Sequence, residues 1–409
     1  PLTGAFSSTD LWNSIRWNDV KAEVHRLQMR IAKAVREGLH GKVKTLQWLL
    51  THSFSAKLLA VKRVVQNAGG KTPGVDKIIW KTPQQKMQAA LSLKRRGYKA
   101  EPLRRVYIPK KDGQHLRPLS IPVMKCRAMQ ALHLLALDPV AEFYADKNSF
   151  GFRPKRSCAD ALMRCFEILA KKGASQYILE ADIKSCFDKI SHKWLRDNIP
   201  MDKEILEKWL TAGYIDNDVF HLTEFGTPQG GVISPTILNL TLRGIEDAVI
   251  RATSKLRDKV HVSIYADDFI ITVTSKEVLE SKVKPVVEEF LNERGLELSQ
   301  EKTKITHIDD GFDFLGTNIR RYNGKLIMKP SKKSISTFLR SIRDVIKSNP
   351  TAKTESLIRL LNPKIRGWTN YHRHFCAKKT FSFIDQRIFE ALWLILLPFN
   401  RHIEAEQSL

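Results

Sequence analysis

Two adjacent aspartates, Asp267 and Asp268, interrupt an apolar, β-branched stretch that reads HVSIYADDFIITV over residues 261–273. The two flanks, 262–265 and 269–273, predict the arms of a hairpin. Successive residues of a strand point to opposite faces, so the two carboxylates can share a site only if they lie at or near the turn. An unpaired buried carboxylate is costly. The pattern alone leaves two interpretations open: a solvated turn, or a site for a divalent cation, which prefers oxygen ligands.

A third carboxylate would have to complete such a cation site. Asp182 comes near the end of an apolar run, YILEADI over residues 177–183, which predicts a buried strand. Two strands that carry one aspartate and an aspartate pair are suited to hold two Mg²⁺ ions. Such a pair of ions activates a hydroxyl nucleophile, stabilises in-line displacement at phosphorus and neutralises the leaving pyrophosphate.

The charge of the chain indicates a polyanionic partner. Its 409 residues include 68 Lys and Arg against 43 Asp and Glu, which gives a net charge of +25 and a pI near 9.8. Residues 94–127 hold eleven basic and two acidic residues, and residues 326–409 hold fifteen and six. A solubility role is the plainer alternative, but for a chain of this size such an excess favours nucleic acid as the partner.

Neither a membrane role nor a disulfide or zinc scaffold is indicated. No apolar run reaches the roughly 18–20 residues that span a bilayer, and the start of the chain lacks the basic-then-apolar pattern of a signal peptide. The five cysteines form no CxxC pair and are odd in number, which favours reduced thiols and a cytoplasmic location. His372 and His374 are poorly spaced to share a metal on a helix, so we expect no zinc.

The remaining patterns predict an α+β protein. Apolar residues at helical spacing predict helices at 20–66, 157–173, 275–294 and from about residue 330 onward, the last with breaks at Pro350 and Pro363. Two extended arms around a Lys/Asp/Gly turn predict a hairpin over 104–122, and a short strand pair is expected around 303–328.

Eight stretches of the chain resemble, in order, the motifs of reverse transcriptases encoded by, or derived from, bacterial group II introns. The stretch YADD at 265–268 resembles the catalytic hairpin of that family. The other stretches are IPKKDGQHLRPLSIP at 108–122, SFGFRPKRSCADAL at 149–162, ADIKSCFDKISH at 181–192, GTPQGGVISPTILN at 226–239, LSQEKTKI at 298–305, FDFLGTNI at 312–319 and LNPKIRGWTNYHRHF at 361–375. One such stretch would support the resemblance only weakly, whereas eight stretches in the order of the family's motifs are highly specific to it.

The resemblance implies a right-hand polymerase fold with fingers, palm and helical thumb. We expect an N-terminal extension with part of the fingers at 1–175, a palm with inserted fingers elements at 176–325, and a thumb or maturase-like region with a truncated DNA-binding segment at 326–409. The implied activity is RNA-directed DNA synthesis from a DNA or RNA primer and dNTPs, on RNA and also on DNA templates. Mg²⁺ is the implied cofactor, with Mn²⁺ as a substitute, and group II intron RNA is a further implied partner.

The resemblance also assigns site residues. Asp182, Asp267 and Asp268 become the catalytic and metal-binding triad, with the backbone of Ile183 as a further ligand. Residues expected to meet the incoming nucleotide are Lys110, Arg117, Ile183, Phe187, Gln229 and Lys302, with Lys111 sharing or replacing the role of Lys110. Phe187 would clash with a 2′-hydroxyl, although a core phenylalanine is the plainer interpretation. Residues expected to contact primer or template are Tyr265, Ala266, Leu315, Gly316, Arg366, Tyr371 and Arg373.

Other functions remain open at this point. The chain could be an RNA-binding maturase without essential polymerase activity, or an RNA-dependent RNA polymerase, although Phe187 argues against the latter. Neither cysteine clusters nor an endonuclease-like pattern follow the thumb, so we expect no target cleavage. The biological setting (intron mobility and splicing, DNA repair or defence), the oligomeric state and the natural template are not indicated, and a bacterial, nucleoid-associated location is the expectation.

Overall fold

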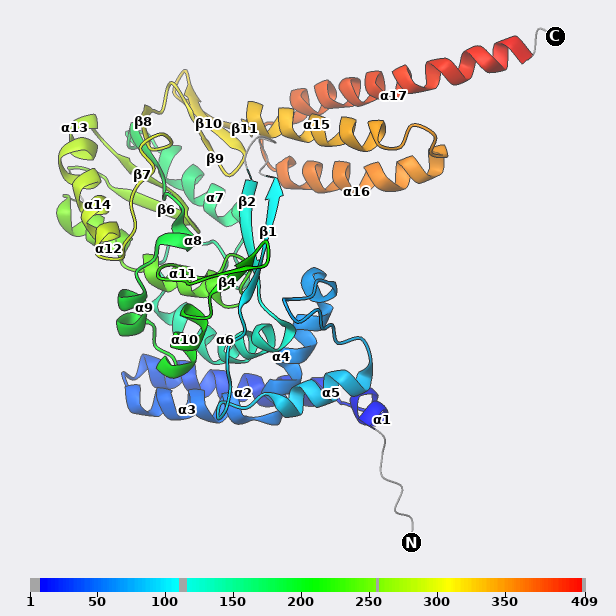
Figure 1. Ribbon diagram of the computed structural model, residues 1–409. Helices are drawn as coiled ribbons and strands as arrows, with labels where there is room; N and C mark the ends of the chain where they lie inside the picture. The colour runs from blue at the N-terminus through cyan, green and yellow to red at the C-terminus, as the bar shows by residue number, and fades with distance from the viewer. Residues whose placement is uncertain (1–7, 110–115, 255–256, 407–409) are drawn as a thin grey trace.

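The computed structural model describes residues 8–109, 116–254 and 257–406, with side chains between residues 11 and 393. Figure 1 shows helices at the N-terminus, a central part that mixes strands and helices, and a group of long helices at the C-terminus. The protein is therefore α+β, as the sequence predicts. Lys110 and Lys111 lie outside the described residues.

The N-terminal part is a layer of helices packed on one long buried helix. Its main helices are α2 (Trp17–Arg36), α3 (His40–His52) and α4 (Phe54–Gln66), and they contact α6 (Met124–Tyr144). The helices predicted within 20–66 are confirmed. Two shorter helices, α1 (Ser8–Asn13) and α5 (Pro83–Ser92), lie beside each other at the edge of this layer.

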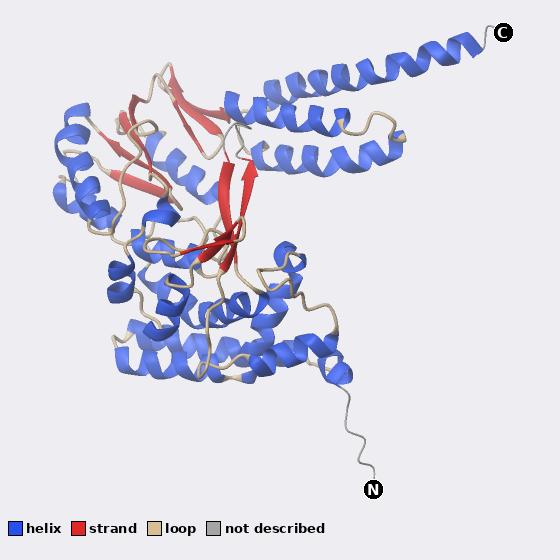
Figure 2. Cartoon of the chain, viewed as in Figure 1, coloured by secondary structure: helices blue, strands red, loops and turns tan. Residues whose placement is uncertain are grey.

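A four-stranded antiparallel sheet with the order β6-β7-β3-β8 forms the centre of the molecule. Its strands are β3 (Tyr177–Asp182), β6 (His261–Tyr265), β7 (Asp268–Val273) and β8 (Lys304–His307). The predicted hairpin and the predicted strand are confirmed, and they pair directly, with Asp182 opposite Asp268. Two helices, α7 (Cys158–Leu169) and α12 (Ile245–Ala252), contact β6 of this sheet, and Figure 2 shows helices beside it. The other helices in this part of the chain are α8 (Cys186–Lys189), α9 (His192–Asn198), α10 (Lys203–Leu210), α11 (Ser234–Leu242), α13 (Lys276–Val278) and α14 (Lys284–Asn292).

A second sheet has the order β2-β1-β4-β5 and projects beside the central one. Its strands are β1 (Leu103–Pro109), β2 (Leu116–Ile121), β4 (Tyr214–Asp216) and β5 (Val219–His221). The predicted hairpin over 104–122 is confirmed in its two arms. The register places Arg117 opposite Ile108, near the end of the hairpin.

The strand pair expected around 303–328 is wrong in number and in pairing. β8 joins the central sheet, while β9 (Phe312–Phe314), β10 (Thr317–Tyr322) and β11 (Lys325–Pro330) form a separate three-stranded sheet. The turn between β10 and β11 is Asn323-Gly324, and both residues have positive φ, 46° and 79°. Asn-Gly is a strong signal for a two-residue hairpin turn, and this signal could have located the extra hairpin.

The C-terminal part consists of α15 (Lys332–Lys347), α16 (Thr354–His372) and α17 (Lys378–Glu406), which share a small apolar core. Pro350 lies between α15 and α16, but Pro363 lies inside α16, so the predicted break there is wrong. Pro363 is exposed, and the carbonyl that loses its helical N–H partner can be hydrated instead. None of the described helices combines the length and the apolar composition needed to cross a bilayer.

Candidate active site

The turn between β6 and β7 is held by a close contact from a distant segment. Ala266 has a φ of 59°, which places it in the left-handed region. Gly151 packs on this turn so closely that a Cβ atom at position 151 would lie 2.3 Å from the backbone nitrogen of Ala266. The backbone nitrogen of Phe150 also donates to the Ile264 carbonyl at 2.9 Å. A turn that Ala-Asp would not favour is therefore stabilised from outside, because only glycine permits this approach.

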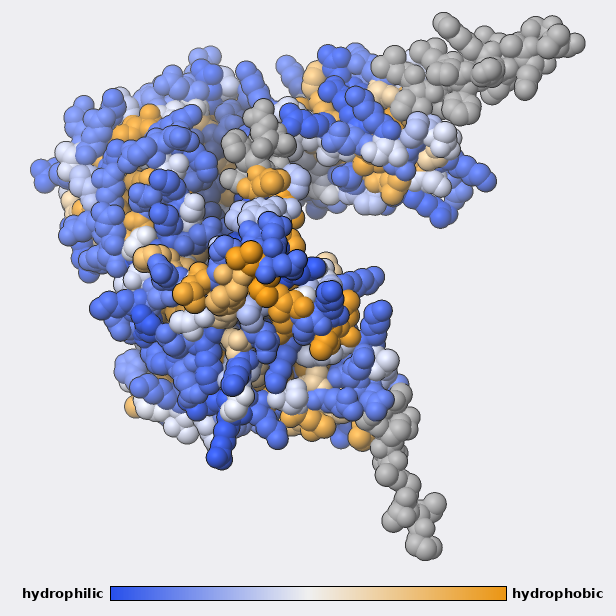
Figure 3. All heavy atoms as spheres, in the orientation of Figure 1, coloured by the Kyte–Doolittle hydropathy of each residue, from blue (hydrophilic) through white to orange (hydrophobic). Residues whose placement is uncertain are grey.

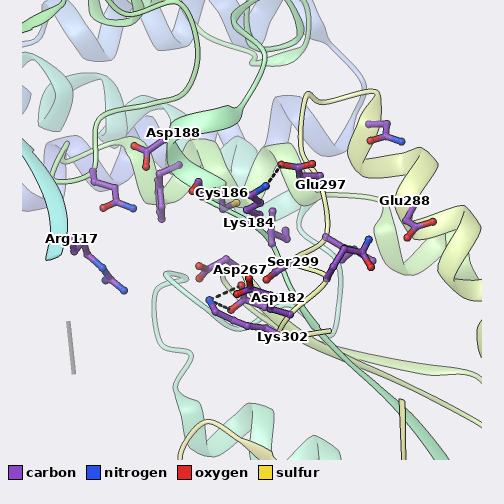
Figure 4. A pocket seen from close by; sticks show the side chains of 18 of the residues that line it. Arg117, Asp182, Lys184, Cys186, Asp188, Asp267, Glu288, Glu297, Ser299 and Lys302 are labelled. Carbon is purple, nitrogen blue, oxygen red and sulfur yellow. Dashed lines mark hydrogen bonds and ion pairs between the residues drawn. The ribbon is translucent and has the colours of Figure 1, made fainter. Parts of the chain in front are cut away.

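Asp182 and Asp267 line one cavity of about 750 Å³ (Figure 4). The two carboxylates and Lys302 gather on one side of it, and Arg117 of β2 lies across from them. Asp268 is exposed at the start of β7 and does not line the cavity. Strand pairing nevertheless places Asp268 directly opposite Asp182, so the three carboxylates lie near one another while only Asp182 and Asp267 line the cavity.

The negative charge of Asp182 raises the pKa of the other two carboxylates. Burial raises the pKa of Asp267, and the charge of Asp182 adds to this effect, while Arg117 and Lys302 oppose it. Although residue 268 as a whole reaches the surface, desolvation of its carboxyl group and then the charges of Asp267 and Asp182 raise the pKa of Asp268 to about 7. The site consequently has an excess of negative charge, which a bound cation would relieve.

Lys302 supplies part of the missing positive charge. Its Nζ donates to Oδ1 and Oδ2 of Asp182 at 3.0 and 3.1 Å. The side chain of Lys302 is 64% exposed, and an ion pair of this kind contributes at most about 1 kcal/mol. A stronger cationic partner of Asp182 could therefore displace Lys302 easily.

The donor set of this cavity fits a hard divalent cation. Two carboxylates, from Asp182 and Asp267, share the cavity with residue Ile183, whose carbonyl is a further oxygen donor. Among the residues that the structure describes, no group of three or more His, Cys, Asp and Glu side chains is close enough to hold a metal as it stands. A cation bound by Asp182 would replace Lys302 as the partner of that carboxylate.

Phe187, on α8, and Gln229, in the segment before α11, line the same cavity. The carbonyl of Phe187 accepts from the backbone nitrogen of Thr227 at 2.6 Å, and the carbonyl of Gln229 accepts from the backbone nitrogen of Ser120 at 2.8 Å. The side-chain Oε1 of Gln229 is buried without a hydrogen-bond partner among the described residues. A buried acceptor left in this state is a candidate ligand contact.

Several residues of the site were missed by sequence reasoning. Gln130 of α6 is buried, and its Oε1 accepts from the backbone nitrogen of Val232 at 2.8 Å. This hydrogen bond supports the Pro-Gln-Gly-Gly turn that comes just before Val232. The wall of the cavity beyond Asp182 is formed in part by Lys184 and Glu297, which form an ion pair of 3.1 Å. Nothing in the local sequence pattern marks these residues.

The turn after β9 is linked to the C-terminal helices. Leu315 and Gly316 both have positive φ, 48° and 74°. The hydroxyl of Tyr371 on α16 donates to the Leu315 carbonyl at 2.7 Å, and the backbone nitrogen of Ser331 donates to the Gly316 carbonyl at 3.0 Å. The structure thus brings these predicted residues together, although they do not line the main cavity.

The remaining predicted contacts are more scattered. Arg366 and Arg373 are exposed on or just after α16. Tyr265 is half-buried, and a hydrogen bond with Cys158 together with burial raises its pKa to about 12. Ala266 is only 4% exposed, and its contact with primer or nucleotide stays a prediction. The packing of Gly151 on the turn is a further reason for its small size.

Three family comparisons together cover most of the chain. Residues 108–319 match the family described as reverse transcriptase (RNA-dependent DNA polymerase). Residues 12–93 match the N-terminal domain of reverse transcriptase, and residues 335–399 match the group II intron, maturase-specific domain.

The chain is also similar to named proteins and to a solved structure. Protein YkfC of Escherichia coli (strain K12) is 31% identical over 306 residues, which cover 64% of this chain and 79% of YkfC. Group II intron-encoded protein LtrA of Lactococcus lactis subsp. cremoris is 27% identical over 390 residues, 79% of this chain and 65% of LtrA, so the match spans slightly less than two thirds of LtrA. A telomerase structure from Candida albicans aligns with 71% of this chain and 55% of its own at a TM-score of 0.45 and 14% identity. The chain belongs to the family of group II intron-type reverse transcriptases and maturases.

Proposed function

We propose that the protein is an RNA-directed DNA polymerase that extends a primer with dNTPs by two-metal phosphoryl transfer, and that it also accepts DNA templates. The observation that carries the proposal is the shared cavity: Asp182 and Asp267 face it together with Arg117, Phe187 and Gln229. Carboxylates for metal ions, a cation for phosphate and a glutamine beside two glycines are the groups that nucleotidyl transfer requires.

The fold supports a right-hand arrangement for this activity. In this proposal the sheet β6-β7-β3-β8 is the palm, within residues 176–325, and the hairpin β1–β2 belongs to the fingers, within residues 1–175. Helices α15 to α17, within residues 326–409, form the thumb. Primer and template would then lie in the hollow that Figure 3 shows between the C-terminal helices and the rest of the surface.

The acidic residues would hold the cofactor and the primer end. Asp182, Asp267 and the carbonyl of Ile183 are the proposed ligands of Mg²⁺, or of Mn²⁺ in its place, and Asp268 would ligate one ion or orient Asp267. When bound, the ions lower the pKa of the primer hydroxyl and neutralise the charge that develops on the phosphate. Asp267 lies at the turn of the β6–β7 hairpin, which Gly151 supports, so its carboxylate is positioned before substrate arrives.

The cationic residues would hold the triphosphate. Arg117 can bind phosphate oxygens in a bidentate manner, and Lys110 of the same hairpin would add a point charge. Lys302, once released from Asp182, would be available to the departing pyrophosphate. Gln229 would contact the minor-groove edge of the new base pair, because its side-chain oxygen is buried without a described partner, and Phe187 would lie under the sugar.

The remaining residues would guide primer and template. The Leu315–Gly316 turn is held by Tyr371 of α16. A movement of α16 would therefore shift a primer end that rests on that turn. Arg366 and Arg373 would contact phosphates of the duplex, and Tyr265 would support the hairpin near the primer end.

Primer extension tests the proposal directly. We expect the purified chain to extend a DNA primer on an RNA template with dNTPs and Mg²⁺, and to use a DNA template as well. The same reaction with ribonucleotides should be much slower. Faster extension with ribonucleotides, or no extension with either, would contradict the proposed function.

A second function is supported by the match of residues 335–399 to the maturase-specific domain. The chain would then bind group II intron RNA and assist splicing, with or without polymerisation. A polymerase used in intron mobility, in DNA repair or in defence would share the same active site. Splicing assays with an inactive polymerase variant separate RNA binding from synthesis.

The raised pKa of Asp268 predicts a pH-dependent response to magnesium. Its pKa of about 7 exceeds that of an aspartate in the unfolded chain. The protonated form therefore stabilises the fold at low pH, and this contribution is lost as the pH rises through about 7. Bound Mg²⁺ acts in the opposite direction because it pairs with the ionised form. We expect Mg²⁺ to raise the thermal midpoint more at roughly one pH unit above this pKa than at one unit below it.

Differential scanning calorimetry with and without Mg²⁺ measures this effect. The control is Asp268→Asn, which removes the titrating group and should flatten the pH dependence. A magnesium response of equal size at both pH values in the unsubstituted protein would contradict the assignment of this carboxylate to the metal site.

A further inference from the structure

Phe152 is an exposed aromatic residue on a strained backbone. Its φ is 59°, in the left-handed region, and the residue is 50% exposed. A bulky L-residue rarely adopts this conformation, whereas glycine adopts it without steric cost. Neither burial nor the shape of the turn therefore accounts for a phenylalanine at this position. Residues strained in this way gather at functional sites, where their surroundings enforce the conformation.

Both neighbours of Phe152 are anchored, so the chain cannot release the strain locally. Gly151 packs directly on the turn of the β6–β7 hairpin. The guanidinium of Arg153 forms an ion pair of 2.6 Å with Glu142, and its Nη1 donates to the Ser149 carbonyl at 2.6 Å. The side chain of Arg153 is only 7% exposed. The position of Phe152 is therefore set by contacts on either side of it.

The ring of Phe152 lies against the ring of Phe187, which lines the active-site cavity. The centroids are 6.4 Å apart and the rings are inclined at 68°, a favourable edge-to-face arrangement. Phe187 lies on α8, which has four residues, and its carbonyl accepts from the backbone nitrogen of Thr227. That hydrogen bond fixes the backbone but leaves the side chain free to change rotamer. The contact with Phe152 restricts this remaining freedom of the ring.

We propose that Phe152 is a positioning residue that holds the Phe187 ring in the path of a 2′-hydroxyl and so contributes to the selection of deoxynucleotides. The inference rests on the proposed polymerase function and on the role of Phe187 in it. Phe152 is not among the described residues that line the cavity, so it acts through Phe187 rather than by contact with the nucleotide. Because Gly151 fixes the same segment to the β6–β7 turn, the ring that limits the sugar is held in register with the metal site.

The ratio of kcat/KM for dTTP over UTP in single-nucleotide extension tests the proposal. We expect Phe152→Ala to lower this ratio about three- to ten-fold, since loss of the aromatic pair lets the Phe187 ring move aside. Phe152→Tyr keeps the ring and should keep the ratio. The matched control is Phe143→Ala, which removes another exposed phenylalanine with an edge-to-face partner, Tyr144, and should leave the ratio unchanged.

A double-mutant cycle distinguishes action through Phe187 from a separate effect. When Phe152→Ala is added to Phe187→Ala, the ratio should change by less than about two-fold, because the ring that Phe152 positions is already absent. A residue that only stabilised the fold would lower kcat/KM for both nucleotides alike in either background. An additional fall in the ratio equal to that of the single variant would overturn the proposal.

Glycine at position 152 separates the ring from the backbone strain. Phe152→Gly removes both, so it should melt about 1–2 °C above Phe152→Ala and still show the same lowered ratio. Return of the parental ratio in the glycine variant would trace the effect to stability and contradict the proposal. An unchanged ratio in Phe152→Ala, in a parent protein that extends primers and prefers dTTP, overturns this inference alone. Absence of extension by the parent overturns the proposed function and this inference with it.

Discussion

Asp267→Asn is expected to abolish primer extension and to leave the fold and template binding intact. Asparagine keeps the shape of the side chain but removes the charge that would hold a metal ion in the cavity. Metal ions contribute several kcal/mol of transition-state stabilisation, so the loss in rate should be about a thousand-fold or more. Single-turnover extension with Mg²⁺, compared with filter binding of the same primer–template, measures both quantities.

The stability of this variant distinguishes a catalytic role from a structural one. Burial and the charge of Asp182 raise the pKa of Asp267 in the folded protein, so its ionised form opposes folding at neutral pH. Asp267→Asn should therefore have a thermal midpoint equal to or above that of the parent protein in the absence of divalent ions. A clear loss of stability would show that inactivity arises from misfolding.

A matched acidic residue provides the control for charge. Asp197 lies on α9, is exposed and pairs with Lys193 at 3.3 Å. Asp197→Asn removes the same charge far from the cavity and should extend primers at the parental rate. Extension by Asp267→Asn within a few-fold of the parental rate would remove the metal-site assignment altogether.

The hairpin that carries Asp267 could be predicted from sequence because its information is local. Two β-branched runs define the arms, and strand alternation allows the aspartates to serve one site only near the turn. The support of that turn is not local. Gly151 lies more than a hundred residues earlier in the chain and reaches Ala266 only in the folded protein. Sequence reasoning alone therefore could not identify the packing of Gly151 as a reason for the small size of Ala266.

The residues that line different sides of the cavity could be predicted only where the family resemblance assigns them a role. Lys302 was expected near the pyrophosphate, but its ion pair with Asp182 depends on how the segment after Leu298 returns to β3. Gln130 lies within a helix in which most residues are buried, so periodicity marks it as an ordinary core position. At Pro363 the local sequence is misleading. Helix propensity predicts a break there, but the exposed face of a helix in a packed bundle tolerates the proline.

Phe187→Ala is expected to relax the preference for deoxynucleotides. Phe187 lines the cavity beside Asp182, and its ring meets that of Phe152 at 68° with centroids 6.4 Å apart. Its backbone is fixed by Gly226, where a Cβ atom would lie 2.4 Å from the Phe187 carbonyl. The ring therefore cannot withdraw easily when a 2′-hydroxyl approaches.

The expected change follows from the cost of that overlap. Forcing extra atoms into a fixed, packed site costs about 1–3 kcal/mol, so the ratio of kcat/KM for dTTP over UTP should fall about ten- to a hundred-fold in Phe187→Ala. Phe187→Tyr keeps the ring and should keep the preference, and Phe166→Ala removes an exposed phenylalanine from α7 as a control. Because the clash affects only the ribonucleotide, kcat/KM for dTTP should change less than that for UTP. An unchanged ratio in Phe187→Ala would mean that another group excludes the 2′-hydroxyl and that Phe187 serves only to pack the α8 segment.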